Sequence, residues 1–214
     1  MSGELRGGQF IRPEAIAETL GISATPVREG LLALRGEGFV HLEPRRGFAV
    51  SPMRAEDIRD LFTAQALLAG ELAARAARLI GPAELAGLER LQAQIEINAE
   101  RQNLDELEDL NWNFHREINR LAAAPKISLL VGVVVVRCVP SRLYSRIEGW
   151  PRSTAEDHQV VLDALRRGSA AKARSAMVRH ITNAGELLAK HYEAADPGVG
   201  VVAEVDAATA GLAG

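Results

Sequence analysis

The sequence predicts a mainly α-helical protein, with an N-terminal winged helix-turn-helix followed by an antiparallel bundle of six helices. Three observations support this fold class. The 214 residues are rich in Ala, Leu, Arg and Glu and only 4% are aromatic, which is typical of helical proteins. Strand-like patterns are confined to the first 50 residues. Beyond them, apolar residues recur at helical spacing between short Gly- or Pro-containing breaks.

The first 50 residues predict a helix, a turn, a second helix and a hairpin. A short amphipathic helix is expected over 12–20, ended by Gly21. Ser23 or Thr25 is suited to cap the second helix, which has Pro26 just inside its start. Two strand-like runs flank EPRRG in FVHLEPRRGFAV, which is the pattern of a hairpin. This order of elements is typical of a winged helix-turn-helix.

The remainder predicts a helical bundle and a tail. The breaks are short, so neighbouring helices should pack antiparallel, and Pro140 should kink the fourth helix. The six helices are expected over Arg54–Ile80, Pro82–Glu100, Leu104–Ala123, Lys126–Glu148, Arg152–Arg167 and Ala170–Ala194. We therefore divide the chain into a winged helix-turn-helix over 1–52, an all-α domain over 53–195 and a disordered tail over 196–214.

Composition and motifs narrow the functional class. The net charge is −3, so the chain as a whole is not a polybasic nucleic-acid binder, although a small basic face is compatible with it. One cysteine, Cys138, excludes an internal disulfide framework and fits a reducing cytoplasm. The longest apolar stretch, Ile127–Val136, is too short to span a bilayer, and no signal peptide is visible. The sequence has no phosphate loop or nucleophile elbow, so we expect a cytoplasmic protein that is not an enzyme.

Three histidines of the predicted bundle form a candidate metal site. Asn111 and His115 are four residues apart and share one helix face. His158 and His180 lie on the last two predicted helices. If the three imidazoles converge with an oxygen ligand, they suit a divalent ion, with zinc favoured over nickel or manganese. The alternative is that each histidine is separately buried and hydrogen-bonded. The two remaining histidines, His41 and His191, are expected at the surface.

Arg137 is a cation that follows four valines on an otherwise apolar stretch. A buried guanidinium needs a partner, because an unpaired buried charge is costly. The partner is either a carboxylate of the bundle or a carboxylate ligand that Arg137 anchors with its planar fork. Arg142 and Arg146 are expected in solvent.

Together, these motifs resemble the GntR family of bacterial transcription regulators, in the subfamily with an FCD ligand-binding domain. The resemblance rests on EAIAETLGISATPVREGLLALRGEGFVHLEPRRGFAV, NWNFHREI, EDHQVVLDALRRG and ARSAMVRH, and covers Ile11 to about His191. It implies a homodimeric regulator, here expected to be a repressor, that binds double-stranded operator DNA and senses a small carboxylate effector. The alternatives are a regulator-derived sensor that has lost DNA binding and a metalloenzyme that uses the three histidines.

The resemblance also assigns residues in the helical domain. It implies that Asn111, His115, His158 and His180 hold the metal, with Asn111 at a position where an Asp is more usual. A neutral amide oxygen is a weaker ligand for a dication than a carboxylate. The family often has an Arg and a Glu early in the first bundle helix. Gln65 and Ala69 stand there instead, so both charges are lost together.

In the N-terminal domain the resemblance implies a DNA surface. Thr25 and Arg28 match positions that contact DNA, and Arg28 is suited to a guanine in the major groove. Ala24 replaces an arginine of the family pattern. The wing matches at Arg45, Arg46 and Gly47, which suit a phosphate or minor-groove contact, the alternative being a solvated basic turn. Residues 1–50 hold six Arg and six Glu, a low net charge for a DNA-binding domain.

Family members begin with an amphipathic helix that this chain lacks ahead of MSGELRGGQFI. Either the true start lies upstream or the domain is incomplete. In the second case, a face of the next two helices loses its cover. The residues then expected to be partly exposed are Ile16, Leu20, Val27 and Leu31.

Overall fold

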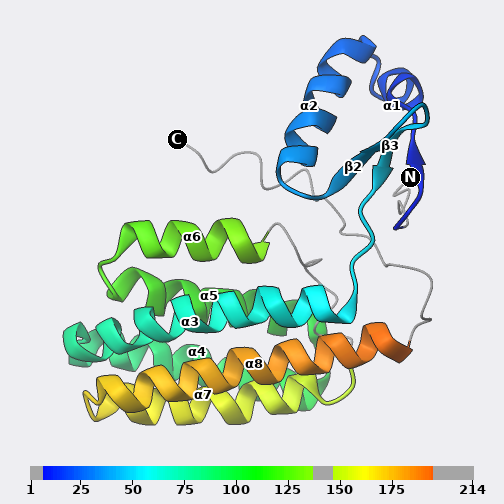
Figure 1. The fold of residues 1–214 in the computed structure, drawn as a ribbon. Helices are drawn as coiled ribbons and strands as arrows, with labels where there is room; N and C mark the ends of the chain where they lie inside the picture. Colours follow the sequence, from blue (N-terminus) through cyan, green and yellow to red (C-terminus); the bar gives the residue numbers. More distant parts are fainter. Residues whose placement is uncertain (1–6, 137–146, 195–214) are drawn as a thin grey trace. The chain divides into compact units, whose positions relative to one another are not determined.

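The structure is a computed structural model and describes residues 7–136 and 147–194 (Figure 1). The described residues up to Arg54 form one compact unit, and Ala55–His191 form another. The first unit contains, in order, β1 (Phe10–Ile11), α1 (Pro13–Leu20), α2 (Ala24–Gly36), β2 (Val40–Glu43) and β3 (Gly47–Val50). Its sheet is antiparallel with the order β1-β3-β2. This arrangement confirms the winged helix-turn-helix.

The turn between α1 and α2 is set by Gly21. This glycine has φ 67° and ends α1 in the left-handed conformation, which a residue without a Cβ adopts at low cost. The next residue, Ile22, donates its N–H to the carbonyl of Ala17 at 3.0 Å, so the chain reverses within one turn. The reversal places α2 across α1, as a helix-turn-helix requires.

A small core holds this unit together. Val27 and Leu31 of α2 are buried, whereas Ile16 is half-buried and Leu20 is 63% exposed. The expected partial exposure was therefore right for the two α1 residues and wrong for the two α2 residues. The reason is that α2 packs on the sheet, which includes the short strand β1. A strand of two residues is too short to give a recognisable pattern in the sequence. The buried members of this core are Ile11, Ala17, Val27, Leu31, Val40, Phe48 and Val50.

The second unit is the predicted six-helix bundle. Within the described residues its helices are α3 (Ala55–Leu79), α4 (Pro82–Arg101), α5 (Leu104–Leu121), α6 (Pro125–Val136), α7 (Trp150–Arg166) and α8 (Ala170–Ala194). The axes of these helices run roughly alongside one another (Figure 1). None of the helices in the described part of the chain is long and apolar enough to cross a membrane.

Several boundaries in the bundle differ from the prediction by one or two residues. The fourth helix was expected to continue to Glu148, but residues 147–149 are not helical, so this prediction was wrong at its end. The kink at Pro140 falls outside the described residues, as do Arg142, Arg146 and the tail. Helix α7 begins at Trp150 because Pro151 occupies its first turn, where a missing N–H costs no hydrogen bond.

Helix α3 is the centre of the bundle and is lined with small residues. It packs against α5, α6 and α7, and it approaches α8 closely at two glycines. A Cβ on Gly70 would lie 2.7 Å from Val178, and a Cβ on Gly185 of α8 would lie 2.6 Å from the Cβ and Cγ of Phe62. Ion pairs from Arg59 to Glu186 and from Arg174 to Glu71 flank the crossing. The position of α8 therefore depends on these glycines.

We expect Gly185→Ala to destabilise the bundle by about 1–3 kcal/mol, because the new methyl group overlaps the side chain of Phe62. The control is Gly87→Ala in α4, where an added Cβ meets only the end of Arg90 at 3.8 Å. That change should be neutral or stabilise by up to about 1 kcal/mol through helix propensity. Urea unfolding of both variants tests this, and equal midpoints would contradict the close α3–α8 packing.

Candidate metal centre and DNA-reading surface

The structure brings His115, His158 and His180 together from α5, α7 and α8. The Nε2 atoms of His115 and His180 are 3.1 Å apart. The rings of His158 and His180 are 4.6 Å apart between centroids, and those of His115 and His158 are 5.2 Å apart. One ligand atom from each imidazole can be chosen so that all lie within 4.8 Å of one another. The convergence that spacing alone left open is thus present in the structure.

His158 and His180 are buried, and His115 is half-buried. His158 is fully buried and stacks on Phe114, with ring centroids 4.0 Å apart. Desolvation, followed by the neighbouring His180, lowers the pKa of His115 to about 3. Burial, with His180 and His115 as lesser causes, lowers the pKa of His158 well below its ordinary value. Both imidazoles are therefore neutral near pH 7, which is the form that ligates a metal.

Several buried atoms at the cluster have no partner among the described residues. Both ring nitrogens of His158 and the Oδ1 of Asn111 belong to this group. Buried polar atoms are normally hydrogen-bonded, and each one left without a partner costs about 1–3 kcal/mol. Asn111 precedes His115 by one helical turn on α5, so its amide oxygen shares a face with that imidazole. The unsatisfied atoms point to a ligand.

Asp157 stands behind the cluster and orients one histidine. Its Oδ2 lies 3.7 Å from Nδ1 of His180. The same Oδ2 accepts a hydrogen bond from Nδ2 of Asn183 at 2.9 Å. The contact with His180 is the largest cause of a lowered pKa at Asp157. A carboxylate beside Nδ1 favours a proton there and leaves Nε2 as the lone-pair atom that faces His115.

The donor set fits a divalent ion of borderline softness. Two nitrogens that bind one tetrahedral zinc at 2.0–2.1 Å lie about 3.3 Å apart, close to the 3.1 Å between His115 and His180. The full set comprises the imidazoles of His115, His158 and His180 and the amide oxygen of Asn111. Asp157 adds the carboxylate that commonly supports a ligating histidine from outside the coordination sphere. These residues therefore fit the metal that the family resemblance implies.

Sequence reasoning missed two residues of this site. Phe114 was not recognised because its aromatic ring is indistinguishable in sequence from other core residues. Asp157 adjoins His158 in the sequence, and its contact with His180 on the next helix depends on how α7 and α8 pack. Gln65 is half-buried and Ala69 is buried, both on α3. Arg137 lies outside the described residues.

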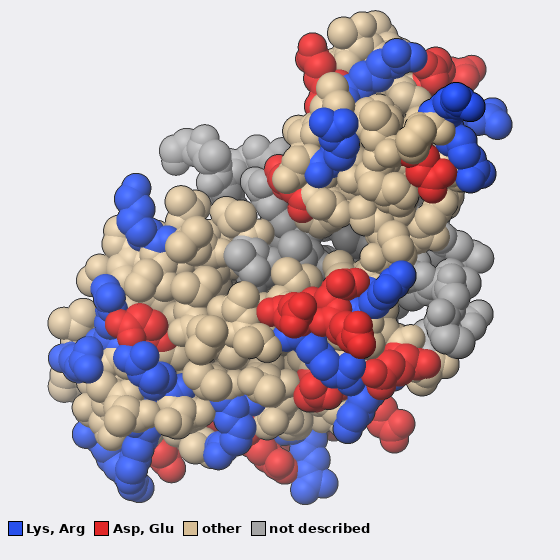
Figure 2. Space-filling model, viewed as in Figure 1, with Lys and Arg blue, Asp and Glu red and all other residues tan. Residues whose placement is uncertain are grey.

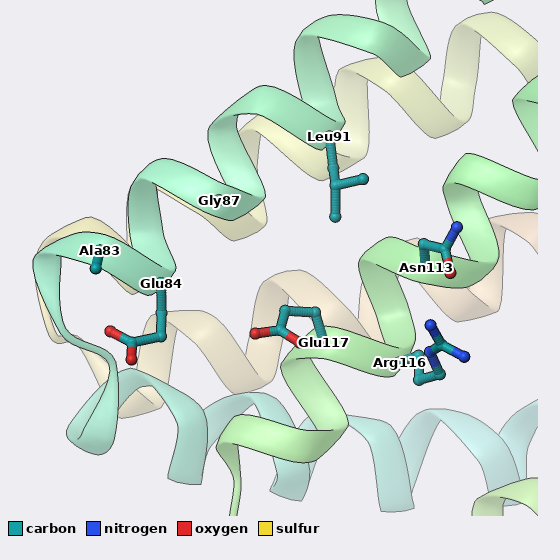
Figure 3. Close-up of a pocket in the computed structure, with 7 residues that line it drawn as sticks. All are labelled: Ala83, Glu84, Gly87, Leu91, Asn113, Arg116 and Glu117. Atoms are coloured by element: carbon teal, nitrogen blue, oxygen red, sulfur yellow. The ribbon is translucent and has the colours of Figure 1, made fainter.

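A separate cleft of about 540 Å³ runs between α4 and α5 (Figure 3). Glu84 and Glu117 point into the gap between the two helices, and Arg116 lies on α5 nearby (Figure 3). None of the four predicted metal ligands lines it. The cleft is lined by Ala83, Glu84, Gly87, Leu91, Asn113, Arg116 and Glu117. It is an outer surface feature, distinct from the histidine cluster.

The start of α2 presents the candidate base-reading residues. Thr25 and Arg28 are both exposed, and Ala24 is half-buried against the core of the unit. The guanidinium of Arg28 is engaged: its Nη2 donates to Oε1 of Glu14 on α1 at 2.6 Å. Figure 2 shows basic and acidic side chains interspersed on this unit. The surface is therefore one of mixed charge.

The wing places Arg45 and Arg46 at an exposed turn. The N–H of Arg46 bonds to the carbonyl of Glu43 at 3.1 Å, with Pro44 and Arg45 at the two central positions. Arg45 has φ 66°, a conformation rare for a residue with a side chain, and Gly47 has φ 92°. The guanidinium of Arg46 lies 4.1 Å above the ring of Phe10 and 3.3 Å from a Glu43 oxygen. Phe10 and Glu43 thus restrain one of the two wing cations.

Both halves of the chain match known sequence families. The profile of the FCD domain matches residues 60–183, and that of the bacterial regulatory proteins of the gntR family matches residues 1–50. The chain belongs to the GntR family of regulators with an FCD domain. In line with this membership, it is a DNA-binding transcriptional regulator and not an enzyme.

Curated relatives of this GntR regulator are also described as transcriptional regulators. An uncharacterized HTH-type regulator of Streptomyces ambofaciens is 29% identical over 189 residues, which cover 83% of this chain and 75% of that protein. LutR of Bacillus subtilis is 25% identical over 212 residues, 90% of this chain and 97% of its own. The repressor RspR of Escherichia coli is 27% identical over 115 residues, 54% of this chain and half of that protein.

Solved structures share the fold. Escherichia coli McbR/YncC has a TM-score of 0.66 and 23% identity, and the match covers 87% of this chain and 90% of that one. Lar, which controls the Listeria monocytogenes agr system, has a TM-score of 0.61 and 16% identity, with 86% and 88% covered. At these identities the likeness establishes the fold alone.

Proposed function

We propose that this regulator is a homodimeric repressor whose helical domain holds a divalent metal ion and senses a small organic acid. The observation that carries the proposal is the meeting of three imidazoles from three helices beside buried atoms that have no partner among the described residues. A purely structural cluster would satisfy those atoms within the protein. Together with the family membership, this favours a ligand-sensing centre.

In this proposal the metal ligands are Asn111, His115, His158 and His180. Zinc is the first choice for such a set, with nickel and manganese as alternatives. When bound, the ion supplies a concentrated positive charge that attracts a carboxylate. Asp157 holds His180 in the ligating tautomer, and Phe114 fixes the plane of His158. Arg137 remains a candidate second anchor for the effector.

On the DNA side, we assign the base-reading role to the start of α2. Thr25 and Arg28 would face the major groove, with Arg28 reading a guanine. The wing residues Arg45, Arg46 and Gly47 would contact the phosphate backbone or the minor groove. The exposure of Arg28, Arg45 and Arg46 supports this assignment.

A second copy of the chain would pack on α6. This helix carries one charged residue, Lys126, yet it presents a side to solvent. Leu129 is 60% exposed, Leu130 is 51% exposed and Val133 is 43% exposed. A helix that is apolar all round is normally buried, and a run of exposed apolar residues commonly marks an interface. In a dimer, effector binding would then act by changing the spacing of the two DNA-reading units relative to the operator half-sites.

The metal assignment predicts about one metal ion per chain. In His158→Leu the metal content should fall to near zero, while His191→Ala, which alters an exposed histidine, should retain it. Saturating zinc at about 100 times its dissociation constant should stabilise the wild type by about 2.7 kcal/mol and leave His158→Leu unchanged. When a chelator removes the metal, His158→Leu should be at least as stable as the wild type, because the leucine side chain buries no unsatisfied nitrogen. Elemental analysis and thermal unfolding measure both effects, and equal metal content in the two variants would refute the site.

The DNA assignment predicts that Arg28→Ala loses about 5- to 150-fold in operator affinity, the value of a bidentate contact of about 1–3 kcal/mol. Arg35→Ala removes the same charge from the last turn of α2 and serves as the matched control. Arg35→Ala should lower the affinity for the operator and the affinity for random sequence by the same factor. Fluorescence anisotropy with an operator selected from random duplexes gives both affinities. Failure to select any duplex at low salt would instead indicate a regulator-derived module that has lost DNA binding.

The dimer assignment predicts that Leu129→Asp shifts the protein toward monomer, because a carboxylate would be buried in an apolar contact. The control is Val160→Asp, which introduces the same charge at an exposed apolar position of α7. Sedimentation velocity at several concentrations distinguishes the two. If wild type and Leu129→Asp sediment identically, α6 is not the interface.

A further inference from the structure

The ion pair between Glu14 and Arg28 is the strongest feature that the proposed function leaves unused. Arg28 is the one cation in the first two turns of α2, and no other arginine there can substitute for it because residue 24 is alanine. Its Nη2 lies 2.6 Å from Oε1 of Glu14, and the two side chains are 61% and 62% exposed. A contact this exposed adds little to stability. Its position at the reading end of the helix suggests a different role.

The local structure fixes where the carboxylate stands. Glu14 is the second residue of α1, directly after Pro13, whose ring holds the first turn of the helix. A carboxylate in a first turn is favoured by the positive end of the helix dipole. The hydrogen bond from Arg28 is the largest cause of a lowered pKa at Glu14, so the carboxylate remains ionised. A charged acceptor of defined position thus stands beside the guanidinium.

Two consequences follow for DNA. A guanidinium has five N–H donors, and one contact with Glu14 leaves enough for the two acceptors, O6 and N7, that guanine presents in the major groove. The pair also restricts a side chain that would otherwise lose more rotamer freedom on binding. On a duplex without the guanine, an unrestrained arginine would turn to a phosphate. The Glu14 carboxylate opposes this by retaining Arg28 and by repelling the phosphates itself.

We propose that Glu14 is a specificity-determining residue, which holds Arg28 for base reading and penalises its use as a phosphate contact. This inference rests on the proposed contact of Arg28 with DNA. It assigns sequence discrimination to a pair of residues on two helices, rather than to α2 alone. It also accounts for the balanced charge of the unit. An acidic residue at this position lowers the affinity for random sequence more than the affinity for the operator.

The experiment compares Glu14→Gln with Glu18→Gln in the full chain. Glu18 lies on the same helix, is exposed, and forms none of the ion pairs found among the described residues. Both changes remove one negative charge, so both should strengthen binding to a scrambled duplex in a salt-dependent way. Only Glu14→Gln should lower the ratio of the affinity for the operator to the affinity for the scrambled duplex. At constant salt this ratio should fall by about fivefold or more, which corresponds to a modest coupling free energy.

A double-mutant cycle shows whether Glu14 acts through Arg28. In an Arg28→Ala background, Glu14→Gln should leave the affinity ratio unchanged. An unchanged ratio for Glu14→Gln in the wild-type background, or an equal fall in both backgrounds, would overturn the inference. If Arg28→Ala lowers the ratio and Glu14→Gln does not, the proposed DNA contact stands and only the role of Glu14 fails. If Arg28→Ala itself leaves the ratio unchanged, both are wrong.

Discussion

The burial of His158 without a hydrogen-bond partner among the described residues is the constraint around which the helical domain is built. An imidazole in an apolar interior is tolerated only if its nitrogens are satisfied or if function requires them. Here the surrounding structure holds the ring in place. Phe114 stacks on its ring, and the rings of His115 on α5 and His180 on α8 each meet it in a T-shaped arrangement. The close α3–α8 crossing at Gly70 and Gly185 fixes the helix that carries His180. Packing distant from the cluster therefore determines its geometry.

The DNA-binding unit follows a different principle, because its core is small and its function lies on the surface. A few buried side chains from two helices and a three-stranded sheet fix the angle between α1 and α2. Within that frame, polar contacts restrain the exposed cations: Glu14 holds Arg28, and Phe10 and Glu43 hold Arg46. The contribution of such restrained cations to binding depends more on the orientation of their guanidinium groups than on the total charge of the unit. This is consistent with a unit in which arginines and glutamates balance.

The fold and the residues of the histidine cluster could be predicted from the sequence, but the contacts that these residues make could not. Helical spacing and Gly or Pro breaks located the six bundle helices, because such signals are local. The end of the fourth helix was misjudged, since residues 147–149 are not helical. Asp157 is the sequence neighbour of His158 but contacts His180, since adjacent residues on a helix point in different directions. Likewise, Glu14 and Arg28 are fourteen positions apart, and only the α1–α2 crossing brings them together.

The origin of the cluster in three helices has a consequence for regulation. A ligand held by side chains of α5, α7 and α8 binds with full affinity only when these helices have one particular arrangement. By linkage, the ligand stabilises that arrangement by the same free energy. Some buried atoms of Asn111 and His158 have no partner among the described residues, which costs free energy. In the proposed regulator, a bound ligand would remove this cost and so favour the arrangement that brings the three helices together. In the proposed regulator, this difference between two arrangements of packed helices is the quantity that an effector would convert into a change at the DNA-reading units.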